Sequence, residues 1–222
     1  MEIKGNINAG YDNSIINSTK STIAGGQTNS ATTGTHIFVG GGQNNLATGN
    51  FTTILGGLNN TSSYGQGQVI GGGTANSIST GNISSIVGGY DNTISGSHNG
   101  QSFIGGGFSN TISQIGQYSS IVGGNSNKIY GISSFIGGGS SNIIQSAATT
   151  SFIGGGNSNS INNYHSTIGG GQNNYISTLS NSAWHTIGGG YRNGITSTSS
   201  SRWLNTIAGG GRNLVAESRY SA

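Results

Sequence analysis

The stretch Ile86–Ile94, with the sequence IVGGYDNTI, governs the architecture, because variants of it recur along the whole chain. Clear copies are Ile104–Ile112 (IGGGFSNTI) and Ile168–Ile176 (IGGGQNNYI). Each copy follows Ile-x-Gly-Gly-x-x-Asn-x-Ile, and we number its residues as positions 1 to 9. The asparagine of position 7 recurs at intervals of 15 to 20 residues in 13 copies: Asn13, Asn29, Asn45, Asn60, Asn76, Asn92, Asn110, Asn127, Asn142, Asn159, Asn174, Asn193 and Asn213.

The composition is dominated by glycine, which makes up 44 of the 222 residues, while only 5% are charged. A glycine-rich chain is usually a flexible linker. Here, however, 32 of the glycines occupy positions 2, 3 and 4 of the motif, so they are structural. Proline and cysteine are absent, which excludes collagen, a disulfide framework and a cysteine-based zinc site.

The repeat length indicates the fold class. A unit of this size is too short for a pair of helices. Isoleucine and valine at positions 1 and 9 favour strands, and the Gly-Gly and polar residues between them favour a turn. We therefore predict an all-β parallel β-solenoid of about 13 coils with a 15–20-residue repeat. Residues 1–222 are expected to form a single repeat domain, with longer linkers carrying aromatic and arginine side chains in 177–222.

The asparagine column has two interpretations. The side-chain amides can form a hydrogen-bonded ladder from coil to coil, as in stacked asparagine arrays. Alternatively, each asparagine occupies a left-handed turn. Both roles are structural.

The residues on either side of position 1 predict a second packed face. Positions 0 and 2 point away from the side chain of position 1, and a large residue at one is matched by a small residue at the other. Such volume compensation is typical of packed interiors. We therefore predict an oligomer interface formed by Phe38, Leu55, Val69, Val87, Phe103, Val122, Phe135 and Phe152.

A family resemblance supports an oligomer. The stretch 186–195, Thr-Ile-Gly-Gly-Gly-x-x-Asn-x-Ile, resembles the head repeat of trimeric autotransporter adhesins, the YadA-like β-roll. The leading Ser/Thr, the aliphatic residue, the glycine and the following small and apolar positions align, and the similarity extends over all 13 copies. Glycine, asparagine and isoleucine replace residues of that family's repeat. The resemblance implies a left-handed β-roll, a homotrimer and an adhesive role, and related rolls occur in viral and phage fibre proteins.

The titratable residues do not form a catalytic or metal site in the sequence, so we expect no enzyme, cofactor or metal. The four carboxylates are scattered, and Asp12 and Asp91 lie five coils apart, about 24 Å at ladder spacing. A pair of catalytic carboxyl groups needs about 5–10 Å. We expect the histidines to be surface residues: His36, His98, His165 and His185. A net charge of +3 predicts no nucleic-acid binding, and no apolar run predicts membrane insertion or a signal peptide.

The C-terminal third contains a candidate recognition surface. Aromatic and arginine side chains are preferred anchors of binding surfaces. The candidates for a glycan or receptor site are Trp184, Tyr191, Arg192, Arg202, Trp203 and Arg212. The alternative is that these residues pack the last coils.

The sequence therefore predicts a non-enzymatic structural or adhesive fibre protein of a cell or virus surface. The motif begins at Ile7 and ends at Val215, leaving little chain to cap the solenoid, so an alternative is an extracellular filament of coils stacked end to end. A second alternative is an ice-binding solenoid, suggested by the column Thr167, Thr186 and Thr206.

Overall fold

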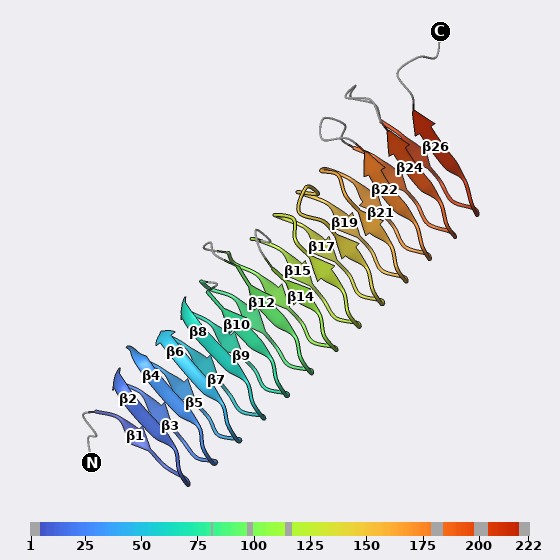
Figure 1. Cartoon of the computed structure of the whole chain (residues 1–222). Coiled ribbons are helices and arrows are strands. Elements are labelled where there is room, and N and C mark those ends of the chain that lie inside the picture. The colour runs from blue at the N-terminus through green and yellow to red at the C-terminus, as the bar shows by residue number, and fades with distance from the viewer. Residues whose placement is uncertain are drawn as a thin grey trace. The chain divides into compact units, whose positions relative to one another are not determined.

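The computed structural model describes residues 5–80, 82–96, 100–113, 117–178, 184–197 and 204–217 (Figure 1). Over these residues the chain forms an all-β parallel β-solenoid of about 12 turns, without any helix. The predicted all-β parallel β-solenoid is confirmed, with about 12 turns where the motif count predicts 13 coils. The exact repeat length, the left-handed roll and the homotrimer stay predictions. The chain comprises two compact units, 1–110 and 111–222, which we describe separately. The expectation of a single repeat domain stays a prediction.

The first unit consists of two parallel sheets, and each coil contributes one strand to each sheet. The first sheet has the order β1 (Ile7–Asn8), β3 (Thr22–Ile23), β5 (Phe38–Val39), β7 (Thr53–Ile54), β9 (Val69–Ile70), β11 (Ser85–Ile86) and β13 (Phe103–Ile104). The second sheet has the order β2 (Ser14–Thr19), β4 (Ser30–Thr35), β6 (Leu46–Asn50), β8 (Thr61–Gln66), β10 (Ser77–Ser79) and β12 (Thr93–Ser95).

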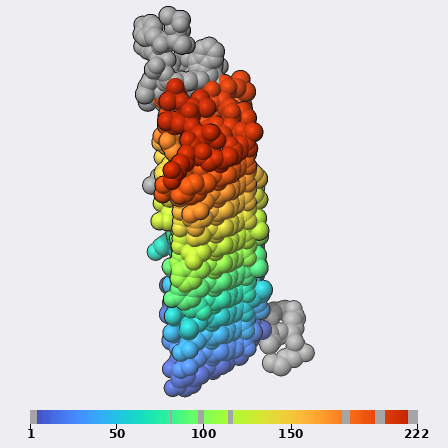
Figure 2. Space-filling view, turned by 90° about the vertical axis from the view of Figure 1, so that its right-hand side faces the viewer, coloured from blue at the N-terminus to red at the C-terminus, as the bar shows by residue number. Residues whose placement is uncertain are grey.

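The second unit repeats this arrangement. Its first sheet has the order β15 (Ser120–Ile121), β17 (Phe135–Ile136), β19 (Phe152–Ile153), β21 (Thr167–Ile168), β23 (Thr186–Ile187) and β25 (Thr206–Ile207). Its second sheet has the order β14 (Thr111–Ile112), β16 (Lys128–Ile129), β18 (Ile143–Ile144), β20 (Ser160–Ile161), β22 (Tyr175–Thr178), β24 (Gly194–Ser197) and β26 (Leu214–Glu217). Within each unit the coils follow one another in sequence order, as the colour gradient shows (Figure 2).

The pairing register stacks equal motif positions on one another. Ile54 pairs with Ile70, and Ile70 pairs with Ile86, so position 1 forms a column. Position 9 forms a second column on the facing sheet. Both columns are buried between the sheets except at the ends, where Ile7 is exposed and Ile15 and Val215 are half-buried. Burying one such side chain contributes about 1.5–3 kcal/mol. These columns are the core predicted from the motif.

The turn between the two strands of a coil uses left-handed backbone conformations at two positions. At position 4, Gly89 has a φ of 92°, and a Cβ there would collide with the carbonyl oxygen of Gly107. At position 6, Asp91 has a φ of 56°, and the equivalent residue of every copy is also left-handed. The Asp91 N–H donates to the Thr74 carbonyl at 2.9 Å, which helps to offset the roughly 1–2 kcal/mol cost of this conformation.

The asparagine of position 7 forms a buried ladder. The Asn76 Nδ2 lies 2.9 Å from the carbonyl oxygen of Gly72, 3.0 Å from that of Gly89 and 3.2 Å from Asn60 Oδ1. Its Oδ1 accepts from the backbone N–H and from Nδ2 of Asn92, both at 3.1 Å. The ladder interpretation is therefore confirmed, and the left-handed interpretation is wrong for position 7, because position 6 carries that conformation.

A further buried column lies at position −1, immediately before position 0, and the sequence analysis missed it. Most of its members are serines whose hydroxyls bond the backbone of the next coil. For example, Ser134 Oγ donates to the Ala148 carbonyl at 3.0 Å and accepts from the Ser151 N–H at 3.2 Å. In three coils of the first unit a larger residue at position −1 follows a smaller one at position 9: Ile37 follows Ala31, Thr52 follows Ala47, and Gln68 follows Ser62, whose hydroxyl donates to it across the core. In these coils the two columns compensate each other in volume. The buried His185, which follows Ile176, departs from this pattern.

Candidate functional site

An exposed apolar stripe follows the outer face of the first sheet in the first unit. Strand pairing aligns Phe38, Thr53, Val69, Ser85 and Phe103 in the column of position 0. Where that column has Thr53 or Ser85, position 2 supplies an exposed Leu55 or Val87 instead. We define the apolar stripe of this unit as Phe38, Leu55, Val69, Val87 and Phe103. Its projecting side chains alternate between two columns from coil to coil.

The second unit has a shorter apolar stripe on the outer face of its first sheet. Val122 and Phe152 are exposed, and Phe135 is half-buried. The rings of Phe135 and Phe152 stack with centroids 5.3 Å apart and an interplanar angle of 3°. The apolar stripe of this unit is therefore Val122, Phe135 and Phe152.

The volume compensation between positions 0 and 2 arises partly from contacts within a single chain. A Cβ on Gly40 would lie 3.3 Å from Phe38 Cε1, and a Cβ on Gly154 would lie 3.4 Å from Phe152 Cε1. Each phenylalanine ring therefore lies over the glycine of its own coil. This contact contributes to the Phe–Gly pairing, although the carbonyl oxygen of the next coil, 2.4 Å from a Cβ on Gly40, is the closer obstacle. The outer side of the ring remains exposed.

The candidate recognition residues of the C-terminal third that the structure describes lie on two edges of the coils, the turn edge and the linker edge. Tyr191 follows β23 in the turn, and the Arg192 guanidinium carbon lies 5.1 Å from its ring centroid, a cation–π contact. Arg212 occupies the left-handed corner of the next coil, where its N–H donates to the Tyr191 carbonyl at 2.7 Å. Trp184 instead belongs to the linker before β23, and in Figure 1 turns and linkers lie at opposite ends of the coil.

Trp184 continues an aromatic cluster on the linker edge. Its ring stacks on His165 with centroids 5.4 Å apart, and Tyr164 meets His165 edge-on. Arg202 and Trp203 lie outside the described residues. The structure thus groups Tyr191, Arg192 and Arg212 and separates Trp184 from them, while their role in recognition stays a prediction.

Two of the carboxylates, Asp12 and Asp91, lie on the turn edge of the first unit. Asp12 and Asp91 both occupy left-handed corners, five ladder steps apart, which is about 24 Å. The Asp91 carboxylate accepts a hydrogen bond from the Ser109 hydroxyl at 2.9 Å. No cluster of three potential metal ligands occurs among the described residues.

The histidines differ in burial. His36 and His165 are exposed, as expected, but the expectation of a surface residue is wrong for His185, which is fully buried in the column of position −1. His98 lies outside the described residues. In the described part of the chain there is also no helix long and apolar enough to cross a membrane.

The threonine column behind the ice-binding alternative is present. Thr167 pairs with Thr186, and Thr186 with Thr206. The residues two positions further along these strands are Gly169, Gly188 and Ala208, so the hydroxyl array is one column wide.

Comparison with known protein-family models and with curated protein sequences finds no match for this chain.

Proposed function

We propose that this chain is a non-enzymatic fibre protein of a cell or virus surface, acting as a shaft or adhesive head, and that it works as a homotrimer. The observation that carries the proposal is the apolar stripe on the outer face of the first sheet. Contiguous apolar surface of this kind marks an interaction site in soluble proteins. The long separation of Asp12 and Asp91 supports a structural rather than a catalytic role.

The spacing of the stripe favours a second copy of the same chain as its partner. Side chains project at every coil, about 4.8 Å apart, alternately from position 0 and position 2. A partner must match this repeat over several coils, and an identical chain in parallel register does so. Position 0 carries the small residues Thr53 and Ser85 in alternate coils, where we expect projecting side chains of that partner to fit. We propose three chains rather than two because the repeat resembles the head repeat of trimeric adhesins.

The mass of the full chain in solution tests this proposal. We expect light scattering after size-exclusion chromatography to give three times the chain mass. The double variant Leu55→Asp/Val87→Asp should give the single-chain mass, because it buries two charges without partners in the interface. The matched control is Ile16→Asp, since Ile16 is 54% exposed, like Leu55 at 55%, but lies on the outer face of the second sheet.

Circular dichroism checks that each variant keeps its strands. A wild-type chain that remains monomeric at about 100 μM, well above the dissociation constant of a stable complex, would refute the trimer. Equal effects of the stripe variant and its control would show that the stripe is not the interface. Long filaments in electron microscopy would favour end-to-end assembly instead.

A further inference from the structure

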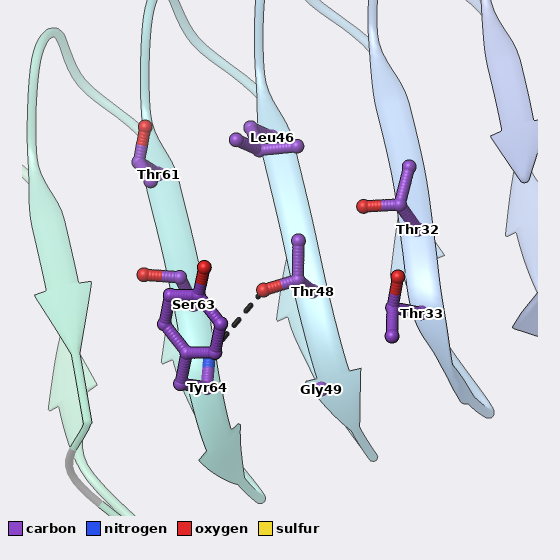
Figure 3. A pocket seen from close by; sticks show the side chains of 8 residues that line it. All are labelled: Thr32, Thr33, Leu46, Thr48, Gly49, Thr61, Ser63 and Tyr64. Atoms are coloured by element: carbon purple, nitrogen blue, oxygen red, sulfur yellow. Dashed lines mark hydrogen bonds between the residues drawn. The ribbon is translucent and has the colours of Figure 1, made fainter. Parts of the chain in front are cut away.

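A groove opens on the outer face of the second sheet in the first unit, on the opposite sheet from the apolar stripe. It lies over β6, between β4 and β8, and has a volume of about 330 Å³ (Figure 3). This volume is at the lower end of the range for small-molecule sites. The lining residues are Thr32, Thr33, Leu46, Thr48, Gly49, Thr61, Ser63 and Tyr64.

The groove exists because β6 is one residue shorter than its neighbours. β4 and β8 each contain an additional left-handed residue, Thr33 with a φ of 52° and Tyr64 with a φ of 58°. In β6, Thr48 is followed directly by Gly49, which pairs with Gly65, and the register shifts at this point. One side chain is therefore missing from the column, and the gap lies between Thr33 and Tyr64. Such bulges often redirect a side chain beside a functional site.

Tyr64 forms the aromatic wall of the groove. Its backbone N–H donates to the Thr48 hydroxyl at 3.3 Å, and Figure 3 shows its ring lying over β8, next to Ser63. The side chain is 83% exposed, so little of the ring is used in packing. The equivalent residue of β4, Thr33, is also left-handed, so this conformation is a property of the coil and not of the tyrosine.

The other lining residues limit the chemistry of a ligand. Thr32, Thr33, Thr48, Thr61 and Ser63 bring hydroxyl groups, which both donate and accept hydrogen bonds. None of the lining side chains is charged at neutral pH, so an ionic ligand would find no counter-charge. A purely apolar ligand would cover the hydroxyls without pairing them, which is unfavourable. The groove suits a neutral molecule with many hydroxyl groups and an apolar face.

We propose that this groove binds a neutral carbohydrate. One sugar ring packs its C–H face against the Tyr64 ring, and its hydroxyl groups bond the threonine and serine side chains of β4, β6 and β8. The inference rests on the proposed adhesive role, for which it names the class of ligand. It does not depend on the number of chains, because the stripe lies on the other sheet.

The test uses the full chain and a panel of soluble oligosaccharides. Cellotetraose, chitotetraose, maltotetraose and lacto-N-tetraose are the neutral probes, and sialyllactose is the charged one. We expect saturation-transfer NMR to detect at least one neutral probe and calorimetry to give its dissociation constant. Tyr64→Ala should weaken that binding by about tenfold or more, and Tyr64→Phe should retain most of it. Tyr118→Ala is the matched control, since Tyr118 is also left-handed and 55% exposed.

A second variant tests the shape of the groove. Inserting one threonine between Thr48 and Gly49 restores the residue that β6 lacks, so it should fill the gap and abolish binding while the chain keeps its strands. The proposal is overturned if no neutral probe binds at about 10 mM, tenfold above a millimolar dissociation constant. It is also overturned if only sialyllactose binds, or if Tyr118→Ala weakens binding as much as Tyr64→Ala. Light scattering on the same samples reports the trimer separately, so failure of one proposal is distinguishable from failure of the other.

Discussion

Removal of one asparagine from the middle of the ladder should destabilise the first unit strongly. The Asn76 side chain is fully buried and makes five polar contacts of 2.9 to 3.2 Å. Three of them share the two protons of Nδ2, so the side chain contributes the equivalent of about four hydrogen bonds. At about 1 kcal/mol for each bond, we expect Asn76→Ala to lower the free energy of unfolding by about 4 kcal/mol.

The groups that bond the Asn76 side chain lose different numbers of hydrogen bonds in Asn76→Ala. The Gly89 carbonyl keeps a hydrogen bond from the Thr74 N–H at 2.9 Å. The Asn92 N–H, in contrast, loses the Asn76 oxygen to which it donates. Asn76→Asp should be worse than Asn76→Ala, because it places an acceptor where the structure has a donor facing three oxygen atoms.

Urea unfolding followed by circular dichroism measures the overall effect, and amide hydrogen exchange measures the local one. We expect the Asn92 N–H to exchange much faster in Asn76→Ala than in the wild type. The control is Asn213→Ala, whose side chain is exposed and donates to Asn193 Oδ1 at 3.1 Å and the Gly209 carbonyl at 2.9 Å. Two such bonds, open to water, give an expected cost of at most about 2 kcal/mol. If both substitutions cost the same, the argument from buried hydrogen bonds is wrong.

Four further results are expected from the same structure. Gly171→Ala should cost more than 3 kcal/mol in urea unfolding, because Gly171 has a φ of 88° and a Cβ there would meet the Gly190 carbonyl, whereas Gly170→Ala, with open space around it, should cost about 1 kcal/mol or less. Ser62→Ile should destabilise the first unit by about 2 kcal/mol, and Ser62→Ile/Gln68→Ser should recover most of this, so an additive double-mutant cycle would contradict the core compensation. Trp184→Ala should leave the strand signal in circular dichroism unchanged, because the indole is exposed and stacks only on the linker edge, and unfolding would instead favour a packing role. The wild type should show no thermal hysteresis, since its threonine column is one residue wide.

The core could be predicted from the sequence because the same residue types return at the same motif positions. Isoleucine at positions 1 and 9 identifies two buried columns, and the invariant asparagine identifies the ladder. The left-handed corner could not be located in this way. Its occupants include Thr28, Ala75 and Arg192, which share no chemistry, and only the backbone bonds of the neighbouring coils fix their conformation.

The position of a residue in the motif does not show where its side chain lies on the coil. Trp184 and Arg192 are close in sequence, yet the strand between them carries them to opposite ends of the coil (Figure 1). The groove depends on a spacing of 15 rather than 16 residues from Asn45 to Asn60, a difference visible in the sequence. Its location within β6 follows only from the pairing of Gly49 with Gly65.

The direction of the asparagine ladder has a consequence for how the chain acquires its fold. Each amide oxygen accepts the backbone N–H of the asparagine in the following coil, as Asn29 does for Asn45 at 3.0 Å. A completed coil is therefore a template whose acceptors are already oriented for the next one. We therefore expect folding to begin with one slow nucleation step, after which each further coil adds rapidly to the end of the folded coils. In a repeat array, nucleation can begin at any coil. For a protein synthesised from its N-terminus, each new coil would emerge beside the surface that orders it.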